Sequence, residues 1–290
     1  MAFKDVLVHI DASASGKSRF VLAADLAARH GARITALYVR EHSIAQLQRL
    51  RSSELGLVSS AQKENLDREL HDEMDANASS IHEWIVDVSA ARGVDIEWRD
   101  VEGHAKSVVP QHARYANITI VGHDTATHAN LPDEYSFAEM MLFTIGRPLI
   151  LVPSVHKAGC DLSSLGRHVA VAWNGSRPSA RSLSDAVPMI EMADKVTVFF
   201  GEDKRARHRD SLSTDQIQPH LERHARKVEG VRFEPDRRSI GVALQEAAIQ
   251  VGADVLVAGA HGRPSLWEKM LGSVTSDLLA HLHLPLFMSF

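Results

Sequence analysis

The chain has 290 residues, 44% of them hydrophobic and 24% charged, a length and composition typical of a globular protein with two domains. Its net charge of −5 argues against general nucleic-acid binding, and no apolar run is long enough to span a bilayer. The N-terminus lacks a signal-peptide pattern, and Cys160, the single cysteine, cannot form an intrachain disulfide. We therefore expect a cytoplasmic protein with no nucleic-acid or membrane partner.

Short apolar runs alternate with helical patterns from the first residues of the chain. The pattern predicts strands near 5–11, 32–39, 94–100, 117–122 and 148–152. It predicts helices near 15–30, 61–91, 104–115 and 134–145. In the long helix, one face carries Leu66, Leu70, Met74 and Ile81. This order, strand then helix, favours a parallel sheet with helices on both faces.

The same order returns in the second part of the chain. Strands are predicted near 167–173, 195–200, 230–234, 254–259 and 284–289. Helices are predicted near 177–192, 213–228, 239–251 and 272–282. In the third of these helices, one face carries Ile240, Leu244, Ala247 and Val251. The stretch from Ser154 to Gly166 lacks periodicity and is predicted to be a linker.

The two parts are copies of one unit. Residues 8–13 match 171–176 at an offset of 163, and residues 116–122 match 253–259 at an offset of 137. The smaller offset means that the first copy carries about 25 extra residues between Val39 and Gly93. Each copy is therefore expected to form its own strand–helix domain.

Two other patterns are weaker. Residues 11–18 resemble a phosphate-binding P-loop, but Asp11 replaces the first glycine, so the tight turn is lost and we do not assign nucleotide binding here. Among 17 histidines, neither the pair His220 and His224 nor the pair His281 and His283 has a third ligand nearby in sequence. We predict no metal site, and we find no nucleophile–base pair that would indicate catalytic residues.

The most informative stretch runs from Gly259 to Thr275. An apolar run at 254–258 is followed by a G-x2-G-x9-G-S pattern and then by an apolar helix face of Val274, Leu278 and Leu282. Glycines allow backbone N–H groups to approach a ligand closely, and a helix N-terminus adds unpaired donors and partial positive charge. The pattern predicts a phosphate cradle. The alternative is that the glycines serve only turns and close helix–sheet packing.

This spacing, its strand and helix context and the duplicated order resemble the universal stress protein family, in its tandem bacterial form. The resemblance implies two Rossmann-like domains, at residues 1–153 and 167–290, each a five-stranded, mainly parallel sheet with helices on both faces. It also implies ATP binding, with Mg²⁺ less certain because Asn174 stands where the family usually has Asp. The residues predicted to bind the nucleotide are Asn174, Gly259, His261, Gly262, Gly272, Ser273, Val274 and Thr275.

The first copy departs from this pattern. Thr125 and Tyr135 stand where the second copy has Gly262 and Gly272, and a bulky Tyr135 would block phosphate oxygens. We therefore expect no ATP binding of the family type in the first domain. Asp11 keeps the family's residue at the first strand, either as a relic or for another ligand.

Together these patterns favour a stress-response regulator that binds ATP or a related adenine nucleotide in its C-terminal domain and acts on an unknown protein partner. We expect no enzyme activity, although slow ATP hydrolysis stays open. The alternative is a binding or scaffold protein that needs no nucleotide and acts through another small ligand or through a homodimer. In that case the apolar segment from Leu284 to Phe290 could form an interface between domains.

Overall fold

The computed structural model of the chain describes residues 2–41, 60–123, 136–154, 164–201, 216–234, 239–260 and 273–290. The N-terminal half contains strands and helices in alternation: β1 (Asp5–Ile10), α1 (Ala14–His30), β2 (Arg33–Arg40), α3 (Ser60–Ala90), β3 (Ile96–Glu102), α4 (Ala105–Ala113), β4 (Ile118–His123), α5 (Phe137–Thr144) and β5 (Leu149–Pro153). The C-terminal half repeats this order: β6 (His168–Trp173), α6 (Arg177–Met192), β7 (Lys195–Phe200), α7 (Ile217–Leu221), β8 (Val228–Arg232), α8 (Ile240–Gln250), β9 (Val255–Gly259), α9 (Ser273–Ala280) and β10 (Leu286–Ser289).

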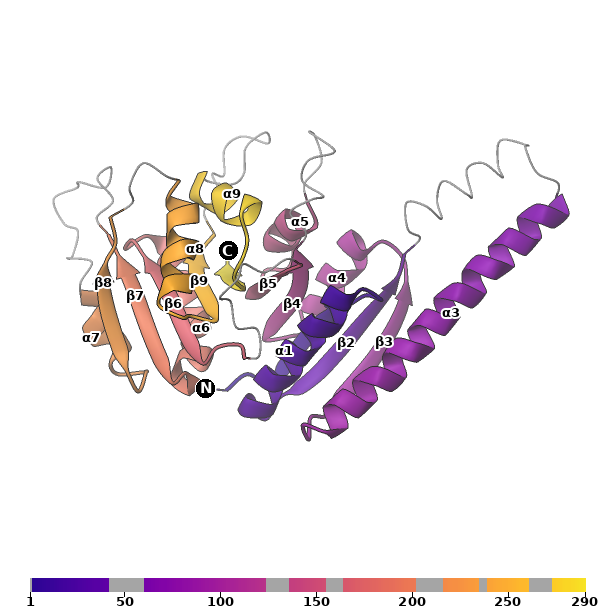
Figure 1. Ribbon diagram of the computed structural model, residues 1–290, viewed down its shortest axis with the longest axis horizontal. Helices are drawn as coiled ribbons and strands as arrows, with labels where there is room; N and C mark the ends of the chain where they lie inside the picture. The colour runs from indigo at the N-terminus through magenta and orange to yellow at the C-terminus, as the bar shows by residue number, and fades with distance from the viewer. Residues whose placement is uncertain are drawn as a thin grey trace.

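All ten strands form one sheet that runs across the whole molecule (Figure 1). The strand order is β3-β2-β1-β4-β5-β10-β9-β6-β7-β8, so each half has its first strand between its second and fourth. Every neighbouring pair is parallel except β5 and β10, which run antiparallel and join the halves. The predicted fold class is confirmed, and the two five-stranded sheets are continuous.

The core lies on both faces of this sheet, because successive side chains of a strand point to opposite faces. Val6 and Val8 of β1 belong to one buried cluster, which also includes residues of α1, α3, α6 and α7. Leu7 belongs to the other, which includes residues of α4, α5, α8 and α9. Each cluster contains residues from both halves, so the hydrophobic core is continuous across the β5–β10 junction.

Helix α3 is the element with no counterpart of similar length in the C-terminal half. Its 31 residues span about 46 Å, and it extends well past the edge of the sheet (Figure 1). Leu70, Met74 and Ile81 on its predicted apolar face are buried, and Leu66 is partly buried. Arg40 fixes the helix laterally, because it contacts Asp75 of α3 and pairs with Asp100 of β3 at 2.6 Å. Among the described residues, no helix has the length and apolar character needed to cross a membrane.

One prediction about the C-terminal helices is wrong. In place of a helix over 213–228, α7 ends at Leu221, and β8 already begins at Val228; residues 211–215 lie outside the described residues. Contacts between distant parts of the chain override the local helical pattern. The Lys227 carbonyl accepts the N–H of Val196, and the segment pairs with β7 as a strand.

The apolar face predicted for α8 is confirmed in part: Leu244 is buried, and Ala247 and Val251 pack against the core. Ile240 is 41% exposed, however, and the buried side of the helix also includes Gly241, Ala243, Gln245 and Ala248. Gly241 lets the helix approach α9 closely, since a Cβ there would lie 2.8 Å from the Leu278 nitrogen. Gln245 then donates to the Leu278 carbonyl at 3.0 Å. Packing of α8 on α9 therefore sets its orientation, with the expected apolar periodicity only partly followed.

The entry into the second half is held by a buried carboxylate. Asp254, 4% exposed, accepts the backbone N–H groups of Gly166 at 2.7 Å and Arg167 at 2.8 Å. Burial raises the pKa of Asp254, and the hydrogen bonds from the backbone oppose that rise. Arg29 of the N-terminal half donates to the Gly166 carbonyl at 3.3 Å, so the start of β6 is tied to both halves. Most of the predicted linker, residues 155–163, lies outside the described residues.

Candidate functional site at the carboxyl ends of the strands

Open parallel sheets bind ligands beyond the carboxyl ends of their strands, where the strand order reverses. In the C-terminal half this point lies between β6 and β9. Asn174 follows β6 directly, is exposed, and accepts the Ser176 N–H on its side-chain oxygen at 3.1 Å. Gly175 has φ +73°, and Ser176 then caps α6 by accepting the Ser179 N–H at 3.4 Å. The predicted Asn174 therefore serves the turn into α6 and presents its side chain at the edge.

Gly259 ends β9 under the first turn of α6. A Cβ at this position would lie 2.5 Å from the carbonyl carbon of Pro178 and 2.5 Å from the nitrogen of Ser179. Only glycine permits this contact between helix and strand. Helix packing by itself accounts for Gly259, and the same contact brings the turn after Asn174 next to the end of β9.

The remaining predicted residues lie at or before the start of α9. Ser273 is exposed, Val274 is partly buried and Thr275 is 1% exposed, all in the first turn of the helix. No acidic residue lies in that turn. His261, Gly262 and Gly272 fall outside the described residues, so the assignment of these three stays a prediction.

The equivalent edge of the N-terminal half is filled from within. Arg19 of α1 is 2% exposed, pairs with Asp11 at 2.6 Å and donates to the His9 carbonyl at 2.7 Å. Its guanidinium lies directly on Gly122, the counterpart of Gly259, because a Cβ there would come within 2.1 Å of Nη1. The position matched to Arg19 in the second half is Ser182, which exchanges hydrogen bonds with the Ser289 backbone at 2.9 and 3.2 Å.

Burial and the contact with Arg19 together determine the charges of Asp11 and His9 at this edge. Burial acts to raise the pKa of Asp11, but Arg19 and the hydrogen bonds from Ser13 outweigh it, and the pKa falls below its usual value. Burial, with a further contribution from Arg19, lowers the pKa of His9 to about 4. At pH 7 the carboxylate is ionised and bound to an internal cation, while the imidazole is neutral. Asp11 is therefore already paired with an internal cation, although its side chain is 44% exposed.

The N-terminus of α5, the helix that follows β4, is capped by its own side chains. The Ser136 hydroxyl accepts the Glu139 N–H at 3.2 Å, and the Glu139 carboxylate accepts the Ser136 N–H at 2.8 Å. This capping box places a negative charge at the start of α5, where phosphate would approach. Its counterpart in α9, at the same offset, is the neutral Ser276. The pattern Ser136-x-x-Glu139 is visible in the sequence and would have revealed the cap.

Neither Arg19 nor Glu139 was part of the predicted site. Arg19 has a weaker sequence signal, an arginine directly before the apolar run that begins at Phe20. Thr125 and Tyr135, the residues on which the closed first site was predicted, lie outside the described residues. His220 and His224 lie with ring centroids 5.1 Å apart. Within the described ranges, no group of three or more His, Cys, Asp or Glu residues is placed to hold a metal.

Comparison with known proteins agrees with this architecture. The model of the universal stress protein family matches residues 2–122 and again residues 167–289. A universal stress protein from Archaeoglobus fulgidus has 16% identity and a TM-score of 0.68, with 98% of this chain and 95% of that chain covered. A functionally unknown protein from Pseudomonas aeruginosa has 13% identity and a TM-score of 0.55, with 99% and 92% covered.

A smaller structure, a universal stress protein from Archaeoglobus fulgidus in complex with dAMP, has 14% identity and a TM-score of 0.34, with 52% of this chain and 98% of that chain covered. No curated protein matches the chain significantly. The two family matches span both halves of the ten-stranded sheet, and the chain therefore belongs to the universal stress protein family, as a tandem member.

Proposed function

We propose that the chain is a stress-response regulator that binds ATP or a related adenine nucleotide at the carboxyl edge of its C-terminal half. The supporting observation is the difference between the carboxyl edges of the two halves. In the N-terminal half, Arg19 covers Gly122 and the Glu139 carboxylate caps the helix start. In the C-terminal half, Ser182 and Ser276 stand at those positions, and the first turn of α9 carries no acidic residue.

The chemistry of the C-terminal edge suits an anionic tail beside a polar ring. The first-turn N–H groups of α9 and the exposed Ser273 hydroxyl are donors for phosphate oxygens. The Asn174 carboxamide can donate to and accept from a base or ribose. His261, Gly262 and Gly272 would complete the cradle. Asn174 supplies no carboxylate for Mg²⁺, which prefers charged oxygen ligands, so we propose that nucleotide binding depends little on the metal.

The proposed role is regulation by binding. A nucleotide that bridges the end of β6 and the start of α9 stabilises whichever conformation holds these two elements together, and it can shift only states that it binds unequally. A protein partner that binds these conformations with different affinities would respond to the presence of the nucleotide. Slow ATP hydrolysis is tested directly by measuring phosphate release from extensively washed protein, where turnover above background would contradict a purely binding role.

Thermal unfolding with and without ATP tests the binding proposal. Wild-type protein should melt at a higher temperature in ATP, because a ligand that binds only the folded state stabilises it. Gly272→Asp should abolish this shift by placing a carboxylate at the phosphate position, whereas Tyr135→Ala, its counterpart in the N-terminal half, should keep it. An unchanged ATP shift in Gly272→Asp would contradict the assignment.

The alternative, a scaffold that needs no nucleotide, meets a structural constraint. The segment from Leu284 to Phe290 was predicted as an interface between domains, and β10 within it does pair with β5 of the N-terminal half, while β9 occupies its other side. A homodimer through this strand would have to break an internal pairing. Sedimentation of the full chain tests for association elsewhere, and the absence of any ATP-dependent melting shift would favour the scaffold.

A further inference from the structure

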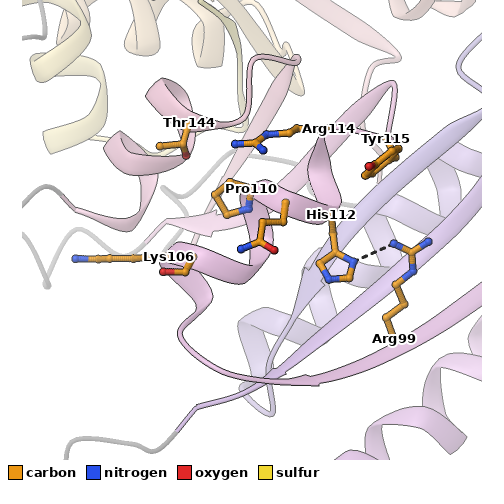
Figure 2. Close-up of a pocket in the computed structure, with 9 residues that line it drawn as sticks. Arg99, Lys106, Pro110, His112, Arg114, Tyr115 and Thr144 are labelled. Carbon is orange, nitrogen blue, oxygen red and sulfur yellow. Dashed lines mark hydrogen bonds between the residues drawn. The ribbon is translucent and has the colours of Figure 1, made fainter.

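A cavity lies away from the strand ends, between α4, α5 and β3. Its volume is about 720 Å³, and it opens to solvent. We call this cavity the basic hollow (Figure 2). Its lining includes Arg99, Lys106, His112, Arg114, Tyr115 and Thr144. Pockets of 300–1,000 Å³ are the usual size for small-molecule ligands.

The described lining of the basic hollow carries positive charge. Arg99, Lys106 and Arg114 are cationic, and no described lining residue is Asp or Glu, although the whole chain has a net charge of −5. Glu97, which is not part of that lining, pairs with Arg99 at 2.8 Å and so offsets part of its charge. Lys106 and Arg114 are exposed, and Figure 2 shows them on either side of Pro110. An anion from solution can therefore reach both side chains.

His112 adds a neutral donor. Its Nδ1 lies 2.9 Å from Nη1 of Arg99, and because a guanidinium can only donate, Nδ1 accepts and the ring hydrogen sits on Nε2. Burial, followed by the effect of Arg99, lowers the pKa of His112, so the ring stays neutral at pH 7. The hollow thus combines ammonium and guanidinium groups with neutral N–H and O–H donors, a mixture suited to phosphate oxygens.

The second half of the chain shows that the fold alone does not produce this charge. A different hollow of about 230 Å³ lies beside α8 in that half, and its lining includes Glu246. At the offset of 137, Lys106, His112 and Arg114 correspond to Ala243, Ile249 and Val251. The basic hollow is therefore a property of the N-terminal half and not of the repeated unit.

We propose that the basic hollow binds a phosphate-bearing small molecule of about nucleotide size. Tyr115, 84% exposed, offers its ring to the organic part of that molecule, and Lys106 and Arg114 hold the phosphate groups. An acidic peptide fits less well, because the apolar lining is limited to Pro110 and the Tyr115 ring, too little to anchor a chain. This site is independent of the nucleotide cradle proposed for the C-terminal half.

Calorimetric titration of the full chain with inorganic tripolyphosphate tests the proposal. The Gly272→Asp background removes any contribution from the C-terminal cradle. In that background we expect binding that Lys106→Glu/Arg114→Glu weakens about a hundredfold or more, since each charge-assisted hydrogen bond is worth roughly tenfold in affinity. The matched control is Arg226→Glu/Lys227→Glu, which reverses two adjacent exposed cations before β8 and should leave the affinity unchanged.

Equal losses in the two double variants would overturn the proposal, because they would indicate only a nonspecific charge effect, and so would the absence of tripolyphosphate binding. Preferential binding of a glutamate-rich peptide over tripolyphosphate would overturn it in favour of a peptide groove. Lys106→Gln/Arg114→Gln, which adds no negative charge, should also weaken binding if both cations contact the ligand. Tyr115→Ala should reduce the affinity for AMP but leave that for tripolyphosphate unchanged.

Discussion

The two carboxyl edges of the sheet share one backbone plan and differ in what touches the glycine at the end of the fourth strand. Gly259 is covered by the backbone of α6 at Pro178 and Ser179, whereas Gly122 is covered by the side chain of Arg19. Asp11 and Asn174 even make the same turn, each accepting the N–H of the serine two residues later, at 2.9 and 3.1 Å. A single long side chain from the neighbouring helix thus fills one site while the surrounding fold stays the same.

The two edges also differ in charge, although their backbones have the same shape. In the N-terminal half the strand-end carboxylate has an internal partner in Arg19, and the helix start has an internal anion in Glu139. In the C-terminal half the corresponding side chains are short and neutral. The difference between the halves can therefore be tested by moving one charge or one methyl group at a time.

The largest expected effect comes from giving α9 the carboxylate that α5 has. Ser276→Glu places an anion in the exposed first turn of α9, and we expect it to abolish stabilisation by ATP, which amounts to about 4 kcal/mol when free ATP is 1,000-fold above its Kd. Ser276→Gln has nearly the same shape without the charge and should keep the stabilisation. Melting curves at matched ATP concentrations measure both, and loss in the Gln variant as well would mean that shape, not charge, decides.

A methyl group at each strand-end glycine should separate the two packing arrangements. Gly259→Ala must move the α6 backbone, which lies 2.5 Å from the new Cβ, and we expect a loss of about 3 kcal/mol in the free energy of unfolding. Gly122→Ala meets only the end of Arg19, which can swing away, and should cost about 1 kcal/mol. Urea unfolding at 25 °C gives both values. Equal costs would show that Arg19 is held as rigidly as the helix backbone.

A smaller difference concerns acid stability. His30 is 5% exposed, and burial, with a contribution from Arg29, lowers its pKa to about 4; its counterpart in the second half is Ala193. Since the unfolded chain binds a proton near pH 6.5 and the folded chain does so only near pH 4, folded-state stability falls as the pH drops through this window. The expected loss between pH 7 and 5 is about 2 kcal/mol.

Urea unfolding at pH 7, 6 and 5 checks this expectation. His30→Gln keeps an acceptor for the Phe3 N–H, which His30 accepts at 3.3 Å, and should flatten the pH dependence by the stated amount. The exposed His281→Gln is the matched control and should leave the slope as in the wild type. An unchanged slope in His30→Gln would mean that other groups cause the acid sensitivity.

The sequence was sufficient for most of the fold because buried strands read as short apolar runs. The interior strands β1, β4, β6 and β9 fall within one residue of their predicted bounds. The edge strand β8 and the short α7 were misplaced, because Val228–Arg232 contains Gly230 and has little apolar character, and its state is decided by pairing with β7. Local pattern could not supply that information.

The glycine pattern directed attention to the end of β9, but it could not supply the contacts that the structure shows there. A glycine pattern indicates that something approaches the backbone closely, and it does not say whether that is a phosphate or a helix; at Gly259 the described contact is a helix. Arg19 reaches Gly122 only because α1 crosses β4 in the fold, a relation that no short stretch of sequence contains. The nucleotide assignment for His261, Gly262 and Gly272 remains a prediction.

The antiparallel junction of Leu286, Phe287 and Met288 with residues 149–151 has a consequence for how the protein behaves in the cell. Because the two halves belong to one polypeptide, their association does not weaken on dilution, and one copy of each is always present. The ratio of the two different edges is thereby fixed by the gene at one to one, and it cannot be altered by exchange of subunits with related proteins.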